Sequence, residues 1–326
     1  MEPTFSVLVA AYNAAGTIAE TLDSLLAQTR GDWEAIVVDD GSADETAAIV
    51  MGYAARDPRI TVQSKVNGGT ASARNFAARI ASGRMWCLLD ADDLYLPGYL
   101  DHMGRFIDEH PDRDIYSASG YYFRDQETPW PDEFPENRSV CTYRVEDMLA
   151  KDCFSVHSVF RPRVFALAGG FDEDPRMVNE DYCFWLTAML RGATHIHNPE
   201  RLWMYRMSEG QKTSDRIRCM RSDVYLLGGL IARKEIVGSR ARIARSARRE
   251  LLTSCRMIRS HQRRVELERQ LTCGELKCAR LEYLLAWRAY GSKAKYLAGL
   301  PIMLLSPSLF GRLLPRIAAG VPRPDL

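Results

Sequence analysis

Residues 85–97 read MWCLLDADDLYLP, and this stretch decides the fold class that the chain is expected to adopt. Its first half is an unbroken apolar run, which is typical of a strand buried on both faces of a mainly parallel sheet. The run ends in three acids within four positions, Asp90, Asp92 and Asp93. Open α/β sheets bind ligands at the carboxyl ends of their strands, so we expect a binding site here.

The three acids have two interpretations. Neighbouring carboxylates repel one another, and a bound cation or fixed hydrogen-bond donors would offset that cost. Mg²⁺ and Mn²⁺ take oxygen ligands, often one or two carboxylates together with substrate phosphates. The alternative is a solvated acidic turn before a helix that begins at Pro97. The context given by the rest of the chain favours the cation.

Strand and helix patterns alternate through the first 110 residues or so, which predicts a doubly wound α/β sheet. Strands are expected at residues 5–11, 35–38, 60–62 and 85–89. Residues 17–20 and 42–45 have the pattern of a capping box, in which a Ser or Thr is followed three positions later by Glu, and each is expected to begin a helix.

Polar residues follow three of these strands and should meet at one edge of the sheet. A nucleotide would fit there, with Asp40 accepting a hydrogen bond from a pyrimidine base and Tyr12 covering the ring. The Gly-Gly turn at residues 68–69 would let backbone donors and Arg74 approach the phosphates. Each residue has a plainer alternative: a turn and cap for Asp40, strand-end packing for Tyr12, and an ion pair for Arg74.

Two common nucleotide motifs are absent from the sequence. The first strand is not followed by the G-x-G-x-x-G of a dinucleotide-binding fold, and no G-x-x-x-x-G-K-[ST] loop occurs anywhere in the chain. Neither of those two modes of nucleotide binding is supported.

Two later segments carry polar residues with open roles. Residues 155–160 have the composition of a strand, and within it His157 is expected to be a hydrogen-bonded, partly buried residue rather than a ligand. Residues 179–182 begin a helix, and acids in a first helical turn are favoured by the helix dipole alone. The same placement would aim Glu180 or Asp181 into the cleft as a general base.

The charge of the chain changes along its length. Residues 1–214 hold 20 Lys and Arg against 33 Asp and Glu, whereas residues 215–300 hold 20 against 8. We expect residues 1–214 to form a catalytic domain and residues 215–326 to form a basic helical region that meets an anionic membrane or carrier. A solvated helical face is the alternative. Nucleic acid is not an expected partner, because no aromatic residues interleave with these arginines.

The sequence favours a cytoplasmic protein, peripheral at the inner face of the membrane. Its eight cysteines form no C-x-x-C pair, and the N-terminus enters a strand at once, without the pattern of a signal peptide. Between Lys295 and Arg312 lie 16 uncharged residues that two prolines interrupt. That segment is too short for a spanning helix and is expected to be interfacial at most.

Together these segments resemble the family 2 glycosyltransferases of the GT-A fold. The matching motifs lie at residues 7–13, 37–42, 67–75, 89–93, 169–172 and 180–181. The resemblance implies an α/β fold: a GT-A, Rossmann-like doubly wound nucleotide-sugar-binding domain, followed here by a mainly α-helical C-terminal region. It also implies a nucleotide-sugar donor, a divalent metal (Mn²⁺ or Mg²⁺) and inversion at the anomeric carbon.

The resemblance also assigns roles on the nucleotide side of the site. Asp40 and Tyr12 would hold the base, with Ala10 beside it. Arg74 would lie near the nucleotide. These four residues come from the first three matching motifs.

For the metal ion and the catalytic base, the resemblance also assigns residues. Asp92 would be the direct metal ligand and Asp93 a weaker candidate. Asp90 would face the ribose or the metal. Asp181 would deprotonate the acceptor hydroxyl, supported by Glu180. This assignment agrees with a single in-line displacement, which needs a base for the acceptor and stabilisation of the departing diphosphate.

The chain departs from the family pattern at two places. Members often carry Tyr-Arg-x-His after the last core strand, and here residues 205–208 read YRMS, so Ser208 replaces the His. That leaves open what would serve as a third metal ligand or phosphate contact. The Gln-x-x-Arg-Trp signature of processive synthases is also absent, which favours the addition of one sugar or a few.

We therefore expect a hexosyltransferase-like enzyme that acts on a hydroxyl of a glycan or lipid-linked acceptor in cell-surface polysaccharide biosynthesis. One alternative is a catalytically degenerate protein that binds nucleotide sugars or acts as a scaffold. A nucleotidyltransferase is less favoured, because the glycine- and arginine-rich loop expected after its first strand is missing.

Overall fold

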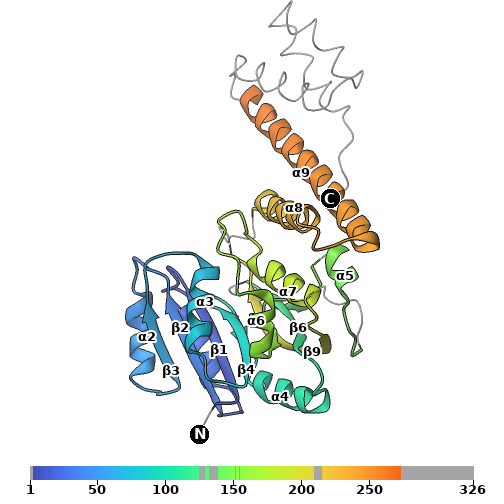
Figure 1. Cartoon of the computed structure of the whole chain (residues 1–326). Coiled ribbons are helices and arrows are strands. Elements are labelled where there is room, and N and C mark those ends of the chain that lie inside the picture. The colour runs from blue at the N-terminus through green and yellow to red at the C-terminus, as the bar shows by residue number, and fades with distance from the viewer. Residues whose placement is uncertain are drawn as a thin grey trace, which may run out of the picture. The chain divides into compact units, whose positions relative to one another are not determined.

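The computed structural model describes residues 3–124, 129–131, 139–150, 152–153, 155–208 and 215–272 (Figure 1). The chain divides into two compact units, residues 1–248 and 249–326. The uncharged segment near the C-terminus and most of the second unit lie outside the described residues. The boundary at residue 214, which the charge distribution suggested, stays a prediction.

The strands and helices have these bounds. The strands are β1 (Phe5–Ala11), β2 (Trp33–Asp39), β3 (Ile60–Ser64), β4 (Met85–Asp90), β5 (Leu94–Tyr95), β6 (Ile115–Phe123), β7 (Trp130–Pro131), β8 (Val159–Phe160) and β9 (His195–Arg206). The helices are α1 (Ile18–Leu26), α2 (Thr46–Ala54), α3 (Thr70–Ile80), α4 (Tyr99–Glu109), α5 (Val145–Ala150), α6 (Pro162–Ala168), α7 (Glu180–Leu190), α8 (Arg216–Ala232) and α9 (Gly238–Thr272).

The described strands form one mixed sheet in the order β3-β2-β1-β4-β8-β6-β9-β5, with β7 paired to β6. The pairs among β1, β2, β3 and β4 are parallel, and β8 is antiparallel to both of its neighbours. The α/β fold and the four N-terminal strands expected from the sequence are confirmed.

Strand register brings the polar strand ends together. Ala10 on β1 lies opposite Asp90 on β4, and Ala11 lies opposite Asp39 on β2. The Asp40 N–H donates to the Ala11 carbonyl at 2.8 Å, so pairing continues to the end of the strand. The prediction that these ends share one edge is confirmed.

Side chains alternate between the two faces of the parallel strands. Phe5, Val7 and Val9 are buried in one hydrophobic core cluster, together with residues of α1, α2 and α4. Helix α3 contacts β1 and β2 (Figure 1). Its buried alanines, such as Ala73 and Ala77, are not in that cluster, which places α3 on the opposite face.

Three local predictions were wrong at the level of individual contacts. Helix α1 begins at Ile18 with Thr17 as its N-cap residue, as predicted, but the Thr17 side chain makes no cap bond. The second capping box is wrong as well, because α2 begins only at Thr46, whose N–H donates to Asp44 at 3.1 Å. Only Val159–Phe160 of the expected strand at 155–160 is a strand. The preceding residues bend, because the Ser158 hydroxyl donates to the Ser155 carbonyl at 2.8 Å.

Among the helices that the structure describes, none combines the length and the hydropathy that a membrane span needs.

Candidate active site

The loops that follow β1, β2 and β4 are joined by hydrogen bonds. The Asn13 N–H donates to Ser42 Oγ at 2.9 Å, and the Ala43 N–H donates to Asn13 Oδ1 at 2.8 Å. Asn13 has a left-handed backbone (φ 47°), which Asn adopts more readily than most residues. The Thr17 hydroxyl donates to the Ala91 carbonyl at 2.9 Å. The residues read as capping boxes therefore tie the strand ends into one surface.

Asp40 directly follows β2 and is only 2% exposed. Its carboxylate accepts hydrogen bonds from the backbone N–H groups of Gly68 (3.0 Å) and Gly69 (2.7 Å) and pairs with Lys65 Nζ at 2.7 Å. The carboxylate thus fixes the Gly-Gly turn before α3. Tyr12 stands on the adjacent loop with 55% of its surface exposed. Contact of either residue with a base stays a prediction.

Arg74 joins two acids that are far apart in sequence. Its guanidinium pairs with Asp90 Oδ1 at 2.5 Å and with Glu180 Oε1 at 3.0 Å, and it lies over the Phe171 ring, 5.6 Å from the centroid. The Arg74 side chain is only 2% exposed. The structure shows the ion pair, and a contact of Arg74 with the phosphates of a nucleotide stays a prediction. The guanidinium connects the acids after β4 to the start of α7.

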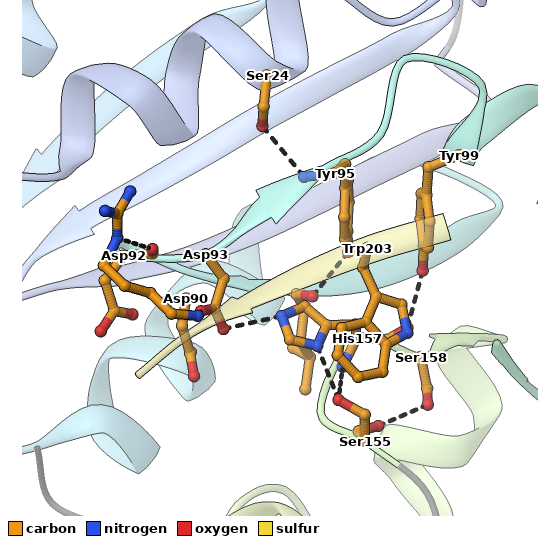
Figure 2. A network of polar contacts seen from close by, with 12 residues as sticks. Ser24, Asp90, Asp92, Asp93, Tyr95, Tyr99, Ser155, His157, Ser158 and Trp203 are labelled. Atoms are coloured by element: carbon orange, nitrogen blue, oxygen red, sulfur yellow. Dashed lines mark hydrogen bonds and ion pairs between the residues drawn. The ribbon is translucent and has the colours of Figure 1, made fainter. Parts of the chain in front are cut away.

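Asp93 is turned into the protein. Its Oδ2 lies 2.8 Å from His157 Nε2, and its Oδ1 accepts the Arg206 N–H at 2.8 Å. Figure 2 shows the chain of contacts continuing from His157 to Ser155 Oγ, 2.7 Å from Nδ1. The imidazole stacks on Trp203 with ring centroids 4.5 Å apart. Burial raises the Asp93 pKa, while His157 opposes that shift.

The other two acids of the cluster keep part of their surface exposed. The Asp90 side chain is 30% exposed, and Asp92 is also half-buried. The Asp92 carbonyl accepts a hydrogen bond from Arg206 Nε at 2.8 Å, and the same guanidinium pairs with Glu20 at 2.6 Å. Arg206 therefore holds the backbone that presents the Asp92 side chain.

The exposure and the hydrogen bonds of Asp90, Asp92 and Asp93 indicate which of them could bind a divalent cation. No group of three or more His, Cys, Asp or Glu in the described part of the chain is arranged to hold a metal ion. Asp90 and Asp92 supply two partly exposed carboxylates at the sheet edge, which suits a cation that substrate phosphates also bind. Asp93 suits it less well, because both of its oxygens are already bonded inside the protein.

Glu180 and Asp181 form the first turn of α7, as the sequence predicted. Glu180 is 6% exposed and turned toward Arg74. Asp181 is half-buried, and its Oδ1 accepts the Tyr182 N–H at 2.9 Å. Burial raises the Asp181 pKa and the charge of Glu180 raises it further, whereas Arg74 lowers it. A raised pKa suits a carboxylate that must take up a proton.

Sequence reasoning missed the role of Arg206 and the partner of His157. His157 was expected to be hydrogen-bonded and partly buried. The hydrogen bonding is confirmed, but the residue is fully buried, and its link to Asp93 spans 64 positions and has no sequence signal. Arg206 ends an otherwise largely apolar stretch of β9, residues 202–206, and a buried charge of that kind indicates a partner. It stands two positions before Ser208.

The fold is that of the GT-A glycosyltransferases. The model of the family described as "Glycosyl transferase family 2" matches residues 6–171, and the chain belongs to that family. The chain is 31% identical over 216 residues to the "Putative teichuronic acid biosynthesis glycosyltransferase TuaG" of Bacillus subtilis. That match covers 66% of this chain and 83% of TuaG.

Solved structures show the same fold at low sequence identity. The S. aureus TarS 1-349 structure in complex with UDP-GlcNAc has a TM-score of 0.65 and 20% identity, covering 98% of this chain and 91% of that one. The mannosyltransferase PcManGT from Pyrobaculum calidifontis, in complex with GDP-Man and Mn²⁺, has a TM-score of 0.59 and 20% identity. That likeness covers 98% of this chain and 85% of PcManGT.

Proposed function

We propose that this chain is a metal-dependent, inverting glycosyltransferase that moves a sugar from a nucleoside-diphosphate sugar to a hydroxyl group. One observation carries the proposal: the buried Arg74 guanidinium joins Asp90 to Glu180. Through Arg74, the acidic sheet edge at Asp90, where a donor and its cation would bind, is held at a fixed place relative to Asp181, the residue after Glu180. A donor-side group and an acceptor-side base are the two requirements of a single displacement.

On the donor side, Asp40, Tyr12 and Ala10 would hold the nucleotide base at the edge of β1 and β2. Asp92, with Asp90 beside it, would hold Mn²⁺ or Mg²⁺. Such a cation, when bound, neutralises the developing charge of the diphosphate. The complexes of TarS with UDP-GlcNAc and of PcManGT with GDP-Man and Mn²⁺ support a nucleotide-sugar donor and a divalent metal here.

On the acceptor side, Asp181 would take the proton of the attacking hydroxyl. The acceptor oxygen then forms a bond to the anomeric carbon as the bond from that carbon to the diphosphate breaks, and the diphosphate leaves with the electron pair. Attack from the opposite face inverts the anomeric configuration. Glu180 would support the base through its contact with Arg74, and the raised Asp181 pKa agrees with this role.

For the acceptor, we propose a growing glycan or a lipid-linked carrier of a cell-surface polysaccharide. The name of TuaG, which refers to teichuronic acid biosynthesis, supports this class of acceptor. The basic residues of region 215–326 would bring the enzyme to an anionic membrane that carries such an acceptor.

A thermal-shift screen tests the donor site without knowledge of the acceptor. We expect one of UDP-, GDP-, CMP- and dTDP-sugars to raise the unfolding temperature, and to do so only with Mn²⁺ or Mg²⁺. A ligand at 100 times its Kd adds about 2.7 kcal/mol to the free energy of unfolding. Asp92→Asn should remove the metal-dependent part of this gain, whereas Asp108→Asn, an exposed acid on α4, should keep it.

If Asp92→Asn binds the donor as the unchanged protein does, the metal assignment is wrong. If none of the nucleotide sugars raises the unfolding temperature, the alternative of a catalytically degenerate family member that acts as a scaffold becomes the better account. Ser208 in place of the family His favours that second candidate.

A further inference from the structure

Helix α8 begins well beyond residue 171, where the match to the family model ends. Ser222 on this helix is only 1% exposed. Its hydroxyl oxygen accepts the backbone N–H of Val178 at 2.9 Å and that of Asn179 at 3.2 Å, and it contacts Met177 Sδ at 3.5 Å. One side chain of α8 therefore satisfies two backbone donors of the segment that leads into α7.

The next residue of α8 holds the same segment by a side chain. Asn179 is the N-cap residue of α7, but its side chain makes no cap bond. The Asn179 Nδ2 group donates instead to Asp223 Oδ1 at 2.8 Å. The Asn179 carbonyl accepts the Cys183 N–H at 3.1 Å, which closes the first turn of the helix. The turn that bears Asp181 thus starts from a residue that α8 fixes from outside.

Tyr225, also on α8, binds the loop that precedes α7. The Tyr225 hydroxyl donates to Asp174 Oδ2 at 3.1 Å and accepts from Arg176 at 2.7 Å, and the Arg176 guanidinium lies over the ring at 4.2 Å. From the other side, Arg74 holds Glu180. The start of α7 is therefore fixed between α3 and α8.

We propose that Ser222 and Asp223 of α8 are positioning residues that hold the first turn of α7, and with it Asp181, in place for proton transfer from the acceptor. The inference rests on the proposed function, in which Asp181 is the base. Proton transfer needs heavy-atom distances of about 2.6–3.2 Å. A displacement of about 1 Å far from the chemistry can lower a rate about a hundredfold. The contacts of Ser222 and Asp223 oppose such a displacement.

The first test measures the contacts themselves and needs no activity. In the full-length protein, Ser222→Ala should raise the hydrogen-exchange rate of the Val178 and Asn179 amides about fivefold, because each loses its acceptor. Amides of β1 should exchange as before. If exchange at residues 178–183 does not change in Ser222→Ala, the proposed hold on α7 is wrong.

The second test measures transfer in Asp223→Ala and Asp223→Asn, with Asp108→Asn as the matched control. We expect Asp223→Ala to lower kcat on the order of tenfold or more, with unchanged KM and Kd for the donor. Asp223→Asn keeps an oxygen that can accept a hydrogen bond from Asn179. Its kcat should therefore lie between that of Asp223→Ala and that of the unchanged protein. Asp108→Asn should behave as the unchanged protein. A purely stabilising contact would lower the unfolding temperature and leave the kcat of the folded enzyme unchanged.

The outcomes separate this inference from the proposed function. If Asp181→Asn abolishes transfer but folded Asp223→Ala and Ser222→Ala keep full kcat, the positioning role is wrong and the base assignment stands. If Asp181→Asn keeps full transfer, the proposed base is wrong. Should Asp223→Ala not fold, an unchanged kcat in both Asp223→Asn and Ser222→Ala would overturn the inference.

Discussion

At the scale of single residues, three acids within four positions have different surroundings. Asp93 is fully buried between His157 and the Arg206 backbone, whereas the Asp90 side chain is 30% exposed. A buried carboxylate needs a partner for each oxygen, because an unpaired charge inside a protein is costly. Asp93 therefore contributes to the fold of the site, and the partly exposed Asp90 and Asp92 are better placed to meet a ligand.

The first prediction at this scale concerns stability. Asp93→Ala removes the partner of His157 and the acceptor of the Arg206 N–H, so it should lower the free energy of unfolding by about 3 kcal/mol. Asp92→Ala should cost less than about 1 kcal/mol, because its side chain is half-buried at the sheet edge. Denaturant unfolding without ligand measures both values. Equal losses of unfolding free energy in Asp93→Ala and Asp92→Ala would contradict the structural role of Asp93 and the ligand-binding role of Asp92.

Residue types alone predicted that polar side chains meet at one edge of the sheet, but not how these side chains pair. The apolar run and the acids after it predicted the sheet edge, because burial and period-two alternation are local properties. The contacts of Arg74 with Glu180, 106 positions away, and of His157 with Asp93, 64 positions away, depend on tertiary packing. For Arg74 the sequence offered both a phosphate contact and an ion pair; the fold shows the ion pair, and the phosphate contact stays a prediction.

At the scale of helices and strands, long periodic segments were predictable and short polar ones were not. Strands β1 and β4 lie where the apolar runs at residues 5–11 and 85–89 placed them. The two capping boxes did not form, since Thr17 and Ser42 make tertiary hydrogen bonds to Ala91 and Asn13 instead. Local motifs are weak guides wherever the same side chain has a partner in another loop.

The pairing of β6 with β9 leads to a prediction about pH. His197 on β9 is buried beside Ser117 and Ser119 on β6, and burial lowers its pKa to about 4. The unfolded chain has a His pKa of about 6.5 and binds the proton first, so stability should fall as the pH drops from about 6.5 to about 4. The loss from His197 should reach about 3 kcal/mol at the lower end.

Comparison with His197→Gln isolates this effect from other titrating groups. The variant should lose less stability than the unchanged protein between pH 6.5 and pH 4, as measured by denaturant unfolding at each pH. A parallel decline in the two proteins would show that His197 is not responsible.

At the scale of the whole molecule, the family match and the charge distribution describe different parts of the chain. The family model covers residues 6–171, and the positive charge is concentrated beyond residue 214. Sequence patterns predicted the GT-A class because four of the six matching motifs lie at or just after the consecutive strands β1, β2, β3 and β4. The contacts by which α8 holds α7 were not predictable, since Ser222 and Asp223 have no motif around them.

The basic region gives the prediction at this scale. Full-length protein should sediment with vesicles that contain anionic lipid and not with neutral vesicles, and the binding should weaken as salt rises. Arg242→Gln together with Arg245→Gln, both exposed on α9, should weaken binding roughly tenfold or more. The control replaces Arg79 and Arg105, which are exposed on α3 and α4, by Gln. Equal binding to neutral vesicles would contradict the expectation.

The most direct test of the central claim compares Asp181→Asn with the unchanged protein, using the donor that the thermal-shift screen identifies. The unchanged enzyme should yield a product whose anomeric configuration, read by NMR, is opposite to that of the donor. Asp181→Asn should bind the donor with unchanged Kd and lose transfer by roughly a hundredfold or more. Full transfer by Asp181→Asn, or a product that retains the donor's configuration, would contradict the account.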